Sequence, residues 1–391
     1  MRRVVSLILA AVIFASLFAS CSEKKKSAKK ADTGMHTLYF KDSNKSKKVS
    51  ATFFNSLSEK STKVKMKKVS EDKDSVTFSC EGNCKLYNMA YITYDDKKTD
   101  EFAFNKCVSG WNTTDVGLLP YAEGEKIDHA PKFKAVTLKA HGFNKNVHIW
   151  TPDDYDAESK DKYSTVYVLD GERMAFIGKE YQGIEGSELV TEQVKAMTAS
   201  TGTKAIVVAI ENAFGRDNEL TPMLGSFPRD EYDNMNGTQF ADFLANTLVP
   251  YVREHYNVYD DALHTSVTGA SLGGLESFYI TTEYPEVFGT AGALSPSFMF
   301  VESEAWDEYL GGKKFTKSSP FLYLYTGNSK DDTDPFVTDM YKRLLKLGYP
   351  KDKLCLHYND KGAHSSIIWR NMFSEFLTAM VFRKVEPLQK K

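Results

Sequence analysis

The sequence has few cysteines, no internal repeat and no excess of charge of one sign. Its 50 lysine and arginine residues nearly balance 52 aspartate and glutamate residues, which leaves a formal net charge of -2 over 391 residues. A balanced charge gives no electrostatic reason to expect a nucleic acid partner. The apolar run at residues 4–18 is too short to cross a bilayer easily, because a spanning helix needs about 20 apolar residues. We therefore expect a globular chain of one large or two ordinary domains.

The five cysteines do not have the spacing of a metal site. Cys80 and Cys84 bracket a short turn, but no second pair of ligands follows at a spacing that suits zinc. We therefore expect neither a metal ion nor any other cofactor. Cys80, Cys84 and Cys107 fall in one predicted domain, where export would allow a disulfide between two of them without requiring it. The sequence leaves that pairing open.

The N-terminus has the pattern of a bacterial lipoprotein signal. A charged start and an apolar middle lead into Leu17-Phe18-Ala19-Ser20-Cys21, which resembles a lipobox. We expect residues 1–20 to be a signal peptide and Cys21 to carry a lipid that anchors the exported protein in the cell envelope. The lysine-rich residues 21–35 cannot fold alone and are expected to form a tether. A short signal anchor is the alternative.

Two patterns divide the rest of the chain. Residues 36–127 contain short alternating runs separated by polar turns, which predicts a small β-sandwich. Trp111 and Tyr121 in this region could stack on sugar rings, but packing in the core or in a loop is favoured. In residues 132–386 strands alternate with helices, which predicts a mostly parallel sheet covered by helices. The predicted fold class is therefore α/β, as a three-layer sandwich with a mostly parallel sheet, preceded by a small all-β domain.

The most informative motif is Gly269-Ala270-Ser271-Leu272-Gly273. A β-branched run precedes it and a helix is predicted over residues 272–283, so Ser271 lies where a strand turns sharply into a helix. Such a turn forces the serine into a strained backbone conformation and leaves room only for glycine two positions to either side. This geometry is typical of a nucleophile elbow, and we predict that Ser271 is a nucleophile.

A serine nucleophile needs a base, and only two histidines follow Ser271. His357 lies in a predicted strand among apolar neighbours, which favours a packed structural role. His364 lies in a turn between the last predicted strand and the final helix, where an α/β-hydrolase presents its catalytic histidine. We predict that His364 is the base.

The base in turn needs an acid, which should lie in the loop that follows Gly327. This loop carries three aspartates, so spacing alone cannot choose among them. Asp334 precedes a proline and a helix and is interpreted as a helix N-cap. Of the other two, Asp331 is slightly favoured and Asp332 is the alternative.

Five further residues are candidates for stabilising the reaction or binding the substrate. The backbone amides of Leu272 and Glu172 follow the strand ends at which an oxyanion hole forms. Arg216, Glu219 and Arg229 lie on a long connection of the kind that forms substrate-binding walls. A salt-bridged loop is the alternative for these three.

Several stretches in residues 134–383 carry a resemblance when they are taken together. They are Tyr167 to Glu172, Ala209 to Asn212, Arg216, Glu219 to Pro222, Leu248 to Val252, Gly269 to Gly274, Leu294 to Ser297, Gly362 to His364, Trp369 and Arg370. They resemble the putative esterase family of α/β-hydrolases, which includes enterochelin esterases, esterase D, feruloyl and acetylxylan esterases, and mycolyltransferases. The resemblance implies Ser271 and His364 as catalytic residues, with an acid in the Gly327 loop. This chain departs from the usual family pattern by having Lys330 followed by consecutive aspartates. The all-β region faintly resembles starch-binding or early-set sandwich modules.

These observations predict an exported, membrane-anchored serine hydrolase without a cofactor. It should cleave a carbohydrate-linked or siderophore carboxylic ester through an acyl-enzyme. An acyltransferase on the same scaffold is one alternative, because a sugar hydroxyl can resolve the acyl-enzyme instead of water. The other is a surface lipoprotein that binds glycans and has an inert hydrolase domain.

Overall fold

The computed structural model describes residues 33–56, 58, 60–114, 117–121, 132–175, 187–212, 215–225, 235–328, 330 and 332–382. The described residues from Gly34 onward belong to one compact unit. The following predictions lie outside the described residues: the signal peptide, Cys21, most of the tether, Arg229 and Asp331. In the part of the chain that is described, no helix is both long and apolar enough to cross a membrane.

The N-terminal region consists of two β-sheets. Its strands are β1 (Met35–Asp42), β2 (Val49–Phe54), β3 (Ser61–Lys65), β4 (Lys67–Glu71), β5 (Val76–Asn83), β6 (Met89–Tyr94), β7 (Lys97–Lys98), β8 (Phe102–Ala103), β9 (Gly110–Thr114) and β10 (Gly117–Tyr121). One sheet has the order β10-β9-β1-β5-β4, and the other has β3-β2-β6-β7 with β8 beside β6. Alternate residues such as Leu38 and Phe40 of β1 pack with Ala51 and Ile92 of the second sheet in one buried cluster.

The two aromatic residues considered as sugar platforms are core residues. Trp111 is fully buried, and its ring packs at 4.9 Å from the ring of Phe102. Tyr121 is 5% exposed. Neither ring offers a face to a ligand, so the structure confirms the packing interpretation that the sequence favours over sugar stacking.

The cysteines of this region do not form a disulfide in the structure. Cys80 and Cys107 are buried thiols, and burial raises the pKa of each to about 12. The Cys84 thiol donates a hydrogen bond to the carbonyl oxygen of Gly34 at 3.0 Å. Buried thiols with raised pKa values are chemically inert.

The C-terminal region is built on an eight-stranded sheet with the order β11-β12-β14-β13-β15-β16-β17-β18. Its strands are β11 (Lys134–Ala140), β12 (Phe143–Trp150), β13 (Ser164–Val168), β14 (Ala205–Ile210), β15 (Thr265–Ala270), β16 (Thr290–Leu294), β17 (Phe321–Thr326) and β18 (Leu354–Tyr358). The β11–β12 hairpin is antiparallel and pairs antiparallel with β14. The other six strands, β13 to β18, are parallel to one another. These six are buried on both faces, as the near-continuous apolar runs of their sequences require.

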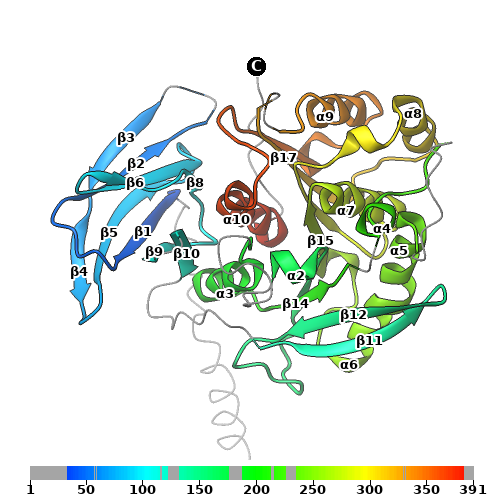
Figure 1. The fold of residues 1–391 in the computed structure, drawn as a ribbon, viewed down its shortest axis with the longest axis horizontal. Helices are drawn as coiled ribbons and strands as arrows, with labels where there is room; N and C mark the ends of the chain where they lie inside the picture. The colour runs from blue at the N-terminus through cyan, green and yellow to red at the C-terminus, as the bar shows by residue number, and fades with distance from the viewer. Residues whose placement is uncertain are drawn as a thin grey trace, which may run out of the picture. The chain divides into compact units, whose positions relative to one another are not determined.

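Helices cover both faces of this sheet (Figure 1). They are α2 (Gly171–Met174), α3 (Val190–Thr201), α4 (Arg216–Glu219), α5 (Gly237–Phe243), η3 (Leu244–Leu248), α6 (Val249–His255), η4 (Ala262–His264), α7 (Leu272–Glu283), η5 (Phe298–Phe300), α8 (Ser303–Gly311), α9 (Phe336–Lys346), η6 (Lys351–Lys353) and α10 (Ser366–Phe382). Residues of α5 to α9 contribute to one core cluster, and residues of α3 and α10 contribute to another. The structure thus confirms the predicted three-layer α/β arrangement and an all-β N-terminal region.

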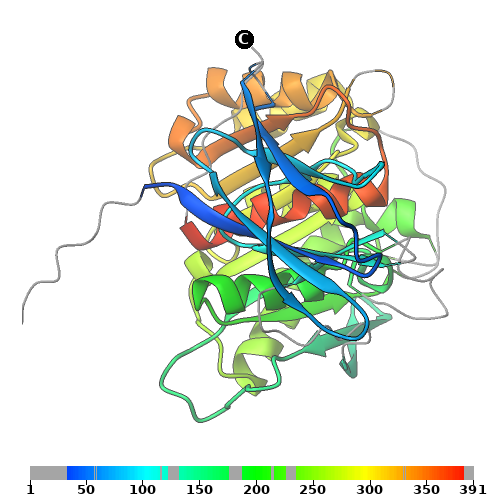
Figure 2. The ribbon, with the colours of Figure 1, turned by 90° about the vertical axis from the view of Figure 1, so that its left-hand side faces the viewer.

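Helices α3 and α10 lie between the central sheet and the all-β region (Figures 1 and 2). The Asn105 side chain donates a hydrogen bond to Ser374 of α10 at 2.8 Å, and Asn371 of α10 donates one to the carbonyl oxygen of Glu101 at 3.1 Å. Cys107 and Met89 of the all-β region belong to the same apolar cluster as α10. The all-β region therefore packs directly on the helix that follows the His364 loop.

Candidate active site

Ser271 lies at the sharp turn between β15 and α7. Its backbone dihedrals are φ 62° and ψ −121°, in a region that non-glycine residues rarely occupy. A Cβ atom on Gly269 would lie 2.5 Å from the backbone of Gly273, so the turn closes only with glycine there. Helix α7 spans Leu272–Glu283, the range predicted from the sequence. The structure therefore shows the strained elbow that the motif predicts.

The Ser271 hydroxyl lies beside a second serine. Its Oγ is 3.3 Å from Oγ of Ser297, and the Ser297 amide donates to the Ser271 carbonyl oxygen at 3.1 Å. Among the described residues, no hydrogen bond joins Ser271 to His364. In unliganded enzymes the catalytic hydrogen bonds are often long and tighten only when substrate is bound.

His364 contacts a buried carboxylate. Its Nδ1 lies 2.8 Å from Oδ1 of Asp332, whose side chain is 0% exposed, while the His364 side chain is 36% exposed. The other oxygen of Asp332 accepts hydrogen bonds from the Ser295 hydroxyl at 2.6 Å and from the Gly327 amide at 2.5 Å. The indole of Trp369 packs edge-on to the imidazole, with ring centroids 4.7 Å apart. The imidazole is thus held on two sides.

These contacts decide the charge of the Asp332 carboxylate. Burial alone would raise its pKa, but hydrogen bonds from His364, Ser295 and Gly327 outweigh burial and lower the pKa below its ordinary value. Asp332 is therefore ionised at neutral pH. Of the two aspartates weighed from the sequence, the favoured Asp331 lies outside the described residues, whereas the alternative, Asp332, is the one in contact with the imidazole.

The loops that carry Asp332 and His364 touch each other. A Cβ atom on Gly327 would lie 2.4 Å from the carbonyl oxygen of Gly362, and the Asn328 amide donates to that same oxygen at 3.2 Å. Both loops follow parallel strands, β17 and β18, at the carboxyl edge of the sheet. Only glycines allow this close approach, which brings the acid and the imidazole within hydrogen-bonding distance.

Ser295 connects Asp332 to Trp369 of α10, a role that was not predicted from the sequence. It follows β16 with a positive φ of 43°. Its hydroxyl accepts a hydrogen bond from Nε1 of Trp369 at 2.8 Å and donates to Asp332. The available signal was the position of Ser295 and Ser297 directly after a strand of the parallel sheet, where functional side chains gather.

Asp334 does not cap α9. The helix begins at Phe336 with Pro335 as its N-cap residue, and the Asp334 carboxylate accepts a hydrogen bond from the Thr338 hydroxyl instead. The N-cap interpretation was wrong, because the proline occupies the capping position.

The two predicted oxyanion donors lie in the first turns of helices. Leu272 is the first residue of α7 and Glu172 is the second residue of α2. Backbone amides in a first turn have no acceptor within the helix. The Glu172 carboxylate accepts hydrogen bonds from the backbone and side-chain nitrogens of Asn212, at 3.2 and 3.0 Å, and burial raises the pKa of Glu172. An oxyanion role for these amides stays a prediction.

Asp170 connects the α2 loop to the elbow. Its carboxylate is 2% exposed and binds Arg216 through two hydrogen bonds, at 2.5 and 2.6 Å, with Arg173 at 3.4 Å. A Cβ atom on Gly273 would lie 3.0 Å from this carboxylate. Burial alone would raise the pKa of Asp170, but Arg216, Arg173 and Asn212 lower it below its ordinary value. Arg216 is therefore held beside the elbow, with about a third of its side chain exposed.

Of the other two predicted substrate-binding residues, only Glu219 is among the described residues. Glu219 is 0% exposed and pairs with Lys145, which is 1% exposed. A carboxylate enclosed in this way cannot reach a substrate, so the structure corrects the substrate-binding interpretation of Glu219 and leaves its salt-bridged alternative. Arg229 lies outside the described residues.

His357 is fully buried in β18. Its Nδ1 contacts the Glu375 carboxylate of α10, which also accepts a hydrogen bond from the Tyr323 hydroxyl at 2.7 Å. These contacts join a strand to the helix that covers it. The structure thus gives His357 the packed structural position that the sequence favours.

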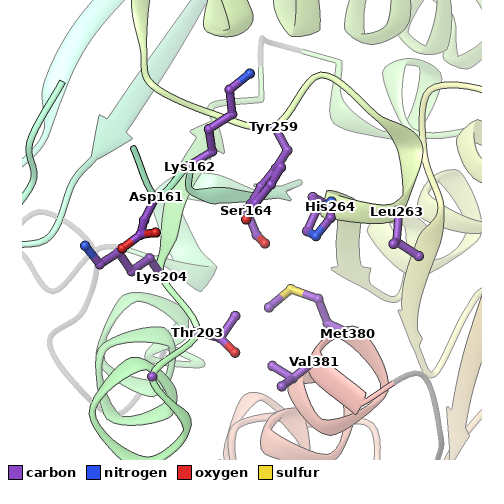
Figure 3. A pocket seen from close by; sticks show the side chains of 11 residues that line it. Asp161, Lys162, Ser164, Thr203, Lys204, Tyr259, Leu263, His264, Met380 and Val381 are labelled. Atoms are coloured by element: carbon purple, nitrogen blue, oxygen red, sulfur yellow. The ribbon is translucent and has the colours of Figure 1, made fainter. Parts of the chain in front are cut away.

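A cavity of about 500 Å³ lies at the amino edge of the parallel sheet, opposite the edge that carries Ser271 (Figure 3). It opens between the amino ends of β13 and β15 and the C-terminal ends of α3 and α10. His264 lies at this cavity, with its ring stacked on Tyr259 at 3.7 Å and its Nδ1 2.8 Å from the Asp261 carboxylate. The cavity is separate from the elbow, because it opens where the parallel strands begin. Nowhere in the described ranges do three or more His, Cys, Asp or Glu residues form a metal site.

Comparisons with known proteins agree with this architecture. The sequence model of the family described as "Putative esterase" matches residues 139–334, just over half of the chain. The "Uncharacterized protein YbbA" of Bacillus subtilis (strain 168) is 25% identical over 232 residues, which cover 56% of this chain and 85% of that protein.

Solved structures of the enterobactin esterase FES from Shigella flexneri have the same fold. The structure in the presence of enterobactin gives a TM-score of 0.50 at 18% identity, covering 89% of this chain and 92% of that one. The structure with 2,3-di-hydroxy-N-benzoyl-glycine gives 0.51 at 16% identity, covering 90% and 97%. The likeness thus extends beyond the α/β region alone. This chain belongs to the putative esterase family of α/β-hydrolases and is a carboxylic ester hydrolase.

Proposed function

We propose that Ser271, His364 and Asp332 form the catalytic triad of this esterase. The observation that carries the proposal is the contact between His364 and the buried, ionised Asp332 at the sheet edge where Ser271 occupies its strained elbow. A carboxylate that accepts a hydrogen bond from the protonated Nδ1 leaves Nε2 of the imidazole free to act as a base. In this arrangement the serine gains a base and the base gains an orienting acid.

The reaction proceeds through an acyl-enzyme. The Ser271 hydroxyl turns from Ser297 toward His364, transfers its proton to Nε2 and attacks the carbonyl carbon of the ester. The Leu272 amide, with the Glu172 amide as second donor, stabilises the oxyanion. His364 then gives its proton to the departing alcohol oxygen. Water, deprotonated by the same imidazole, attacks the acyl-enzyme, and the imidazole returns that proton to Oγ of Ser271 as the bond to the acyl group breaks and the acid leaves.

The proposed substrate is a carbohydrate-linked or siderophore ester. The FES structures, determined in the presence of enterobactin or of a dihydroxybenzoyl compound, support the siderophore option through a shared fold. The partly exposed guanidinium of Arg216, fixed beside the elbow by Asp170, supports a substrate with an anionic or strongly polar group.

The protein is further proposed to be an exported lipoprotein anchored at Cys21. The lipobox-like sequence that ends at this cysteine supports the proposal. Replacing Cys21 by serine in the expressing bacterium should move the protein out of the membrane fraction and abolish incorporation of labelled palmitate. Retention of both in the Cys21→Ser variant would contradict the anchor.

Purified mature protein should be assayed on feruloyl, acetyl-xylan and catecholate esters beside p-nitrophenyl acetate. We expect turnover of p-nitrophenyl acetate and of at least one natural ester, with a loss of about 10⁴-fold or more in kcat in Ser271→Ala. Turnover that Ser271→Ala leaves unchanged would contradict the triad. Transfer of the acyl group to an added polyol in preference to water would instead identify an acyltransferase.

A further inference from the structure

Four large apolar side chains are exposed on connections that leave the carboxyl edge of the parallel sheet, the edge that carries Ser271. Met223 is 49% exposed, Met299 39%, Phe300 42% and Phe336 46%. We refer to these four residues as the apolar rim. Met223 follows β14, Met299 and Phe300 follow β16, and Phe336 follows β17. The connections that leave this carboxyl edge of the sheet also carry Ser271, Asp332 and His364.

The rim begins next to the nucleophile. Ser297, whose hydroxyl is 3.3 Å from that of Ser271, directly precedes η5. Within η5, Phe298 is buried against Phe278 and Trp306, with ring centroids 5.0 and 5.7 Å away. The next two residues, Met299 and Phe300, are exposed. A buried anchor thus fixes two solvent-facing apolar side chains two and three positions from Ser297.

The remaining rim residues lie on elements that pack around η5. Helix α9, whose first residue is Phe336, packs against η5. Arg343 of α9 donates a hydrogen bond to Ser303 of α8 at 2.6 Å, so α8 lies beside α9. The Met223 segment reaches α8 as well, because a Cβ atom on Gly225 would lie 2.9 Å from Cβ of Ala305.

We propose that the apolar rim binds an alkyl or aryl group of the ester substrate. The proposal rests on the proposed function, because it needs Ser271 to be the nucleophile. An apolar group of the substrate that covers the rim removes apolar surface of both molecules from water, which is favourable. The rim therefore selects esters with a bulky apolar substituent over the corresponding small esters.

The opposite edge of the same region supplies matched controls. Leu263 is 52% exposed, Leu347 39% and Phe382 46%. Leu263 precedes β15, and the other two lie at the C-terminal ends of α9 and α10, so all three are at the edge away from Ser271. Their exposure is similar to that of the rim residues, but their position gives them no access to the ester.

The test compares two series of esters, because an apolar substituent could be on either side of the scissile bond. The acyl series compares p-nitrophenyl hexanoate with p-nitrophenyl acetate, and the alcohol series compares hexyl acetate with ethyl acetate. We expect kcat/KM of the wild-type protein to favour the longer ester by about tenfold in one series. In Met299→Ser/Phe300→Ser this preference should fall by at least about threefold, and Phe300→Leu should retain most of it.

The control is Leu347→Ser, which should keep the wild-type preference in both series. Thermal unfolding midpoints of all variants establish that they are folded. Ser271-dependent turnover with no preference in either series, or a preference that Met299→Ser/Phe300→Ser leaves intact, would overturn the rim's role and leave the triad standing. Absence of Ser271-dependent turnover of every ester would overturn the proposed function and the rim's role with it.

Discussion

The two edges of the central sheet each hold a histidine in contact with an aspartate. At the carboxyl edge Nδ1 of His364 lies 2.8 Å from Asp332, and at the amino edge Nδ1 of His264 lies 2.8 Å from Asp261. The distances are equal, but the surroundings differ. The Asp332 side chain is 0% exposed, whereas that of Asp261 is 47% exposed.

The difference shows that a histidine–aspartate contact alone does not define a catalytic site. Asp332 is buried with three donors on its two oxygens, while water screens the exposed pair at Asp261. His364 shares its edge with the strained Ser271, whereas the ring of His264 is stacked on Tyr259 beside the open cavity (Figure 3). Enclosure of the acid and a strained nucleophile at the same edge distinguish the two.

Substitution of the two histidines should give the largest difference in kcat between the two edges. His364→Ala should lower kcat for p-nitrophenyl acetate by about 10⁴-fold, because Ser271 loses its base. His264→Ala should change kcat by less than about twofold. Steady-state kinetics of the two purified variants give the comparison. A comparable loss in both would show that the cavity edge takes part in the reaction.

Substitution of the two aspartates should give a smaller difference in kcat, because the acid that orients the base contributes less to the rate than the base itself. Asp332→Asn should lower kcat by about 10³-fold, whereas Asp261→Asn should leave it within about twofold. Asp331→Asn, assayed in parallel, decides between the two neighbouring aspartates of the loop. A large loss in Asp331→Asn with near-normal turnover in Asp332→Asn would refute the assignment of Asp332.

The free energy of unfolding should fall more when a buried carboxylate is replaced than when an exposed one is. Asp170→Asn leaves Arg216 without its buried partner and should lower the free energy of unfolding by about 3 kcal/mol, against less than about 1 kcal/mol for Asp261→Asn. The pKa of Asp170 is lower in the folded protein than its ordinary value of 3.8. Its stabilising effect is therefore complete above about pH 4 and is lost as the pH falls through the folded pKa.

Urea unfolding at several pH values tests the pH dependence of the stabilisation by Asp170. The difference between wild type and Asp170→Asn should be constant from pH 5 to 8 and should shrink below about pH 4. A difference that already disappears between pH 7 and 5 would show that Asp170 is not held ionised by the arginines.

The smallest expected effect concerns Ser295. Ser295→Ala removes one of the donors to Asp332 and one contact of Trp369, and should lower kcat by about tenfold, the equivalent of one hydrogen bond to a charged group. The control at the other edge is Thr203→Ala, at the cavity that His264 lines, which should leave kcat unchanged. An unchanged kcat in Ser295→Ala would show that the other donors suffice to hold the acid.

The local parts of the site could be predicted from the sequence, and the long-range contacts could not. The elbow at Ser271 is encoded within a few residues by glycine spacing and a helix start, so both its strain and the limits of α7 were predictable. The partner of Glu219 is Lys145, 74 positions earlier on a hairpin, and nothing near Glu219 indicates a buried pair. The choice of Asp332 depends on which carboxylate the Gly327 and Gly362 loops enclose. That is decided by packing between two strand ends.

Labelling of the purified protein with a fluorophosphonate, followed by peptide mass spectrometry, reports whether His364 activates Ser271. A serine activated by a base reacts with this reagent, whereas an ordinary serine hydroxyl does not. We predict one adduct, on Ser271, which is lost in His364→Ala and retained in His264→Ala. An adduct on another serine, or labelling of Ser271 that persists without His364, would contradict the account.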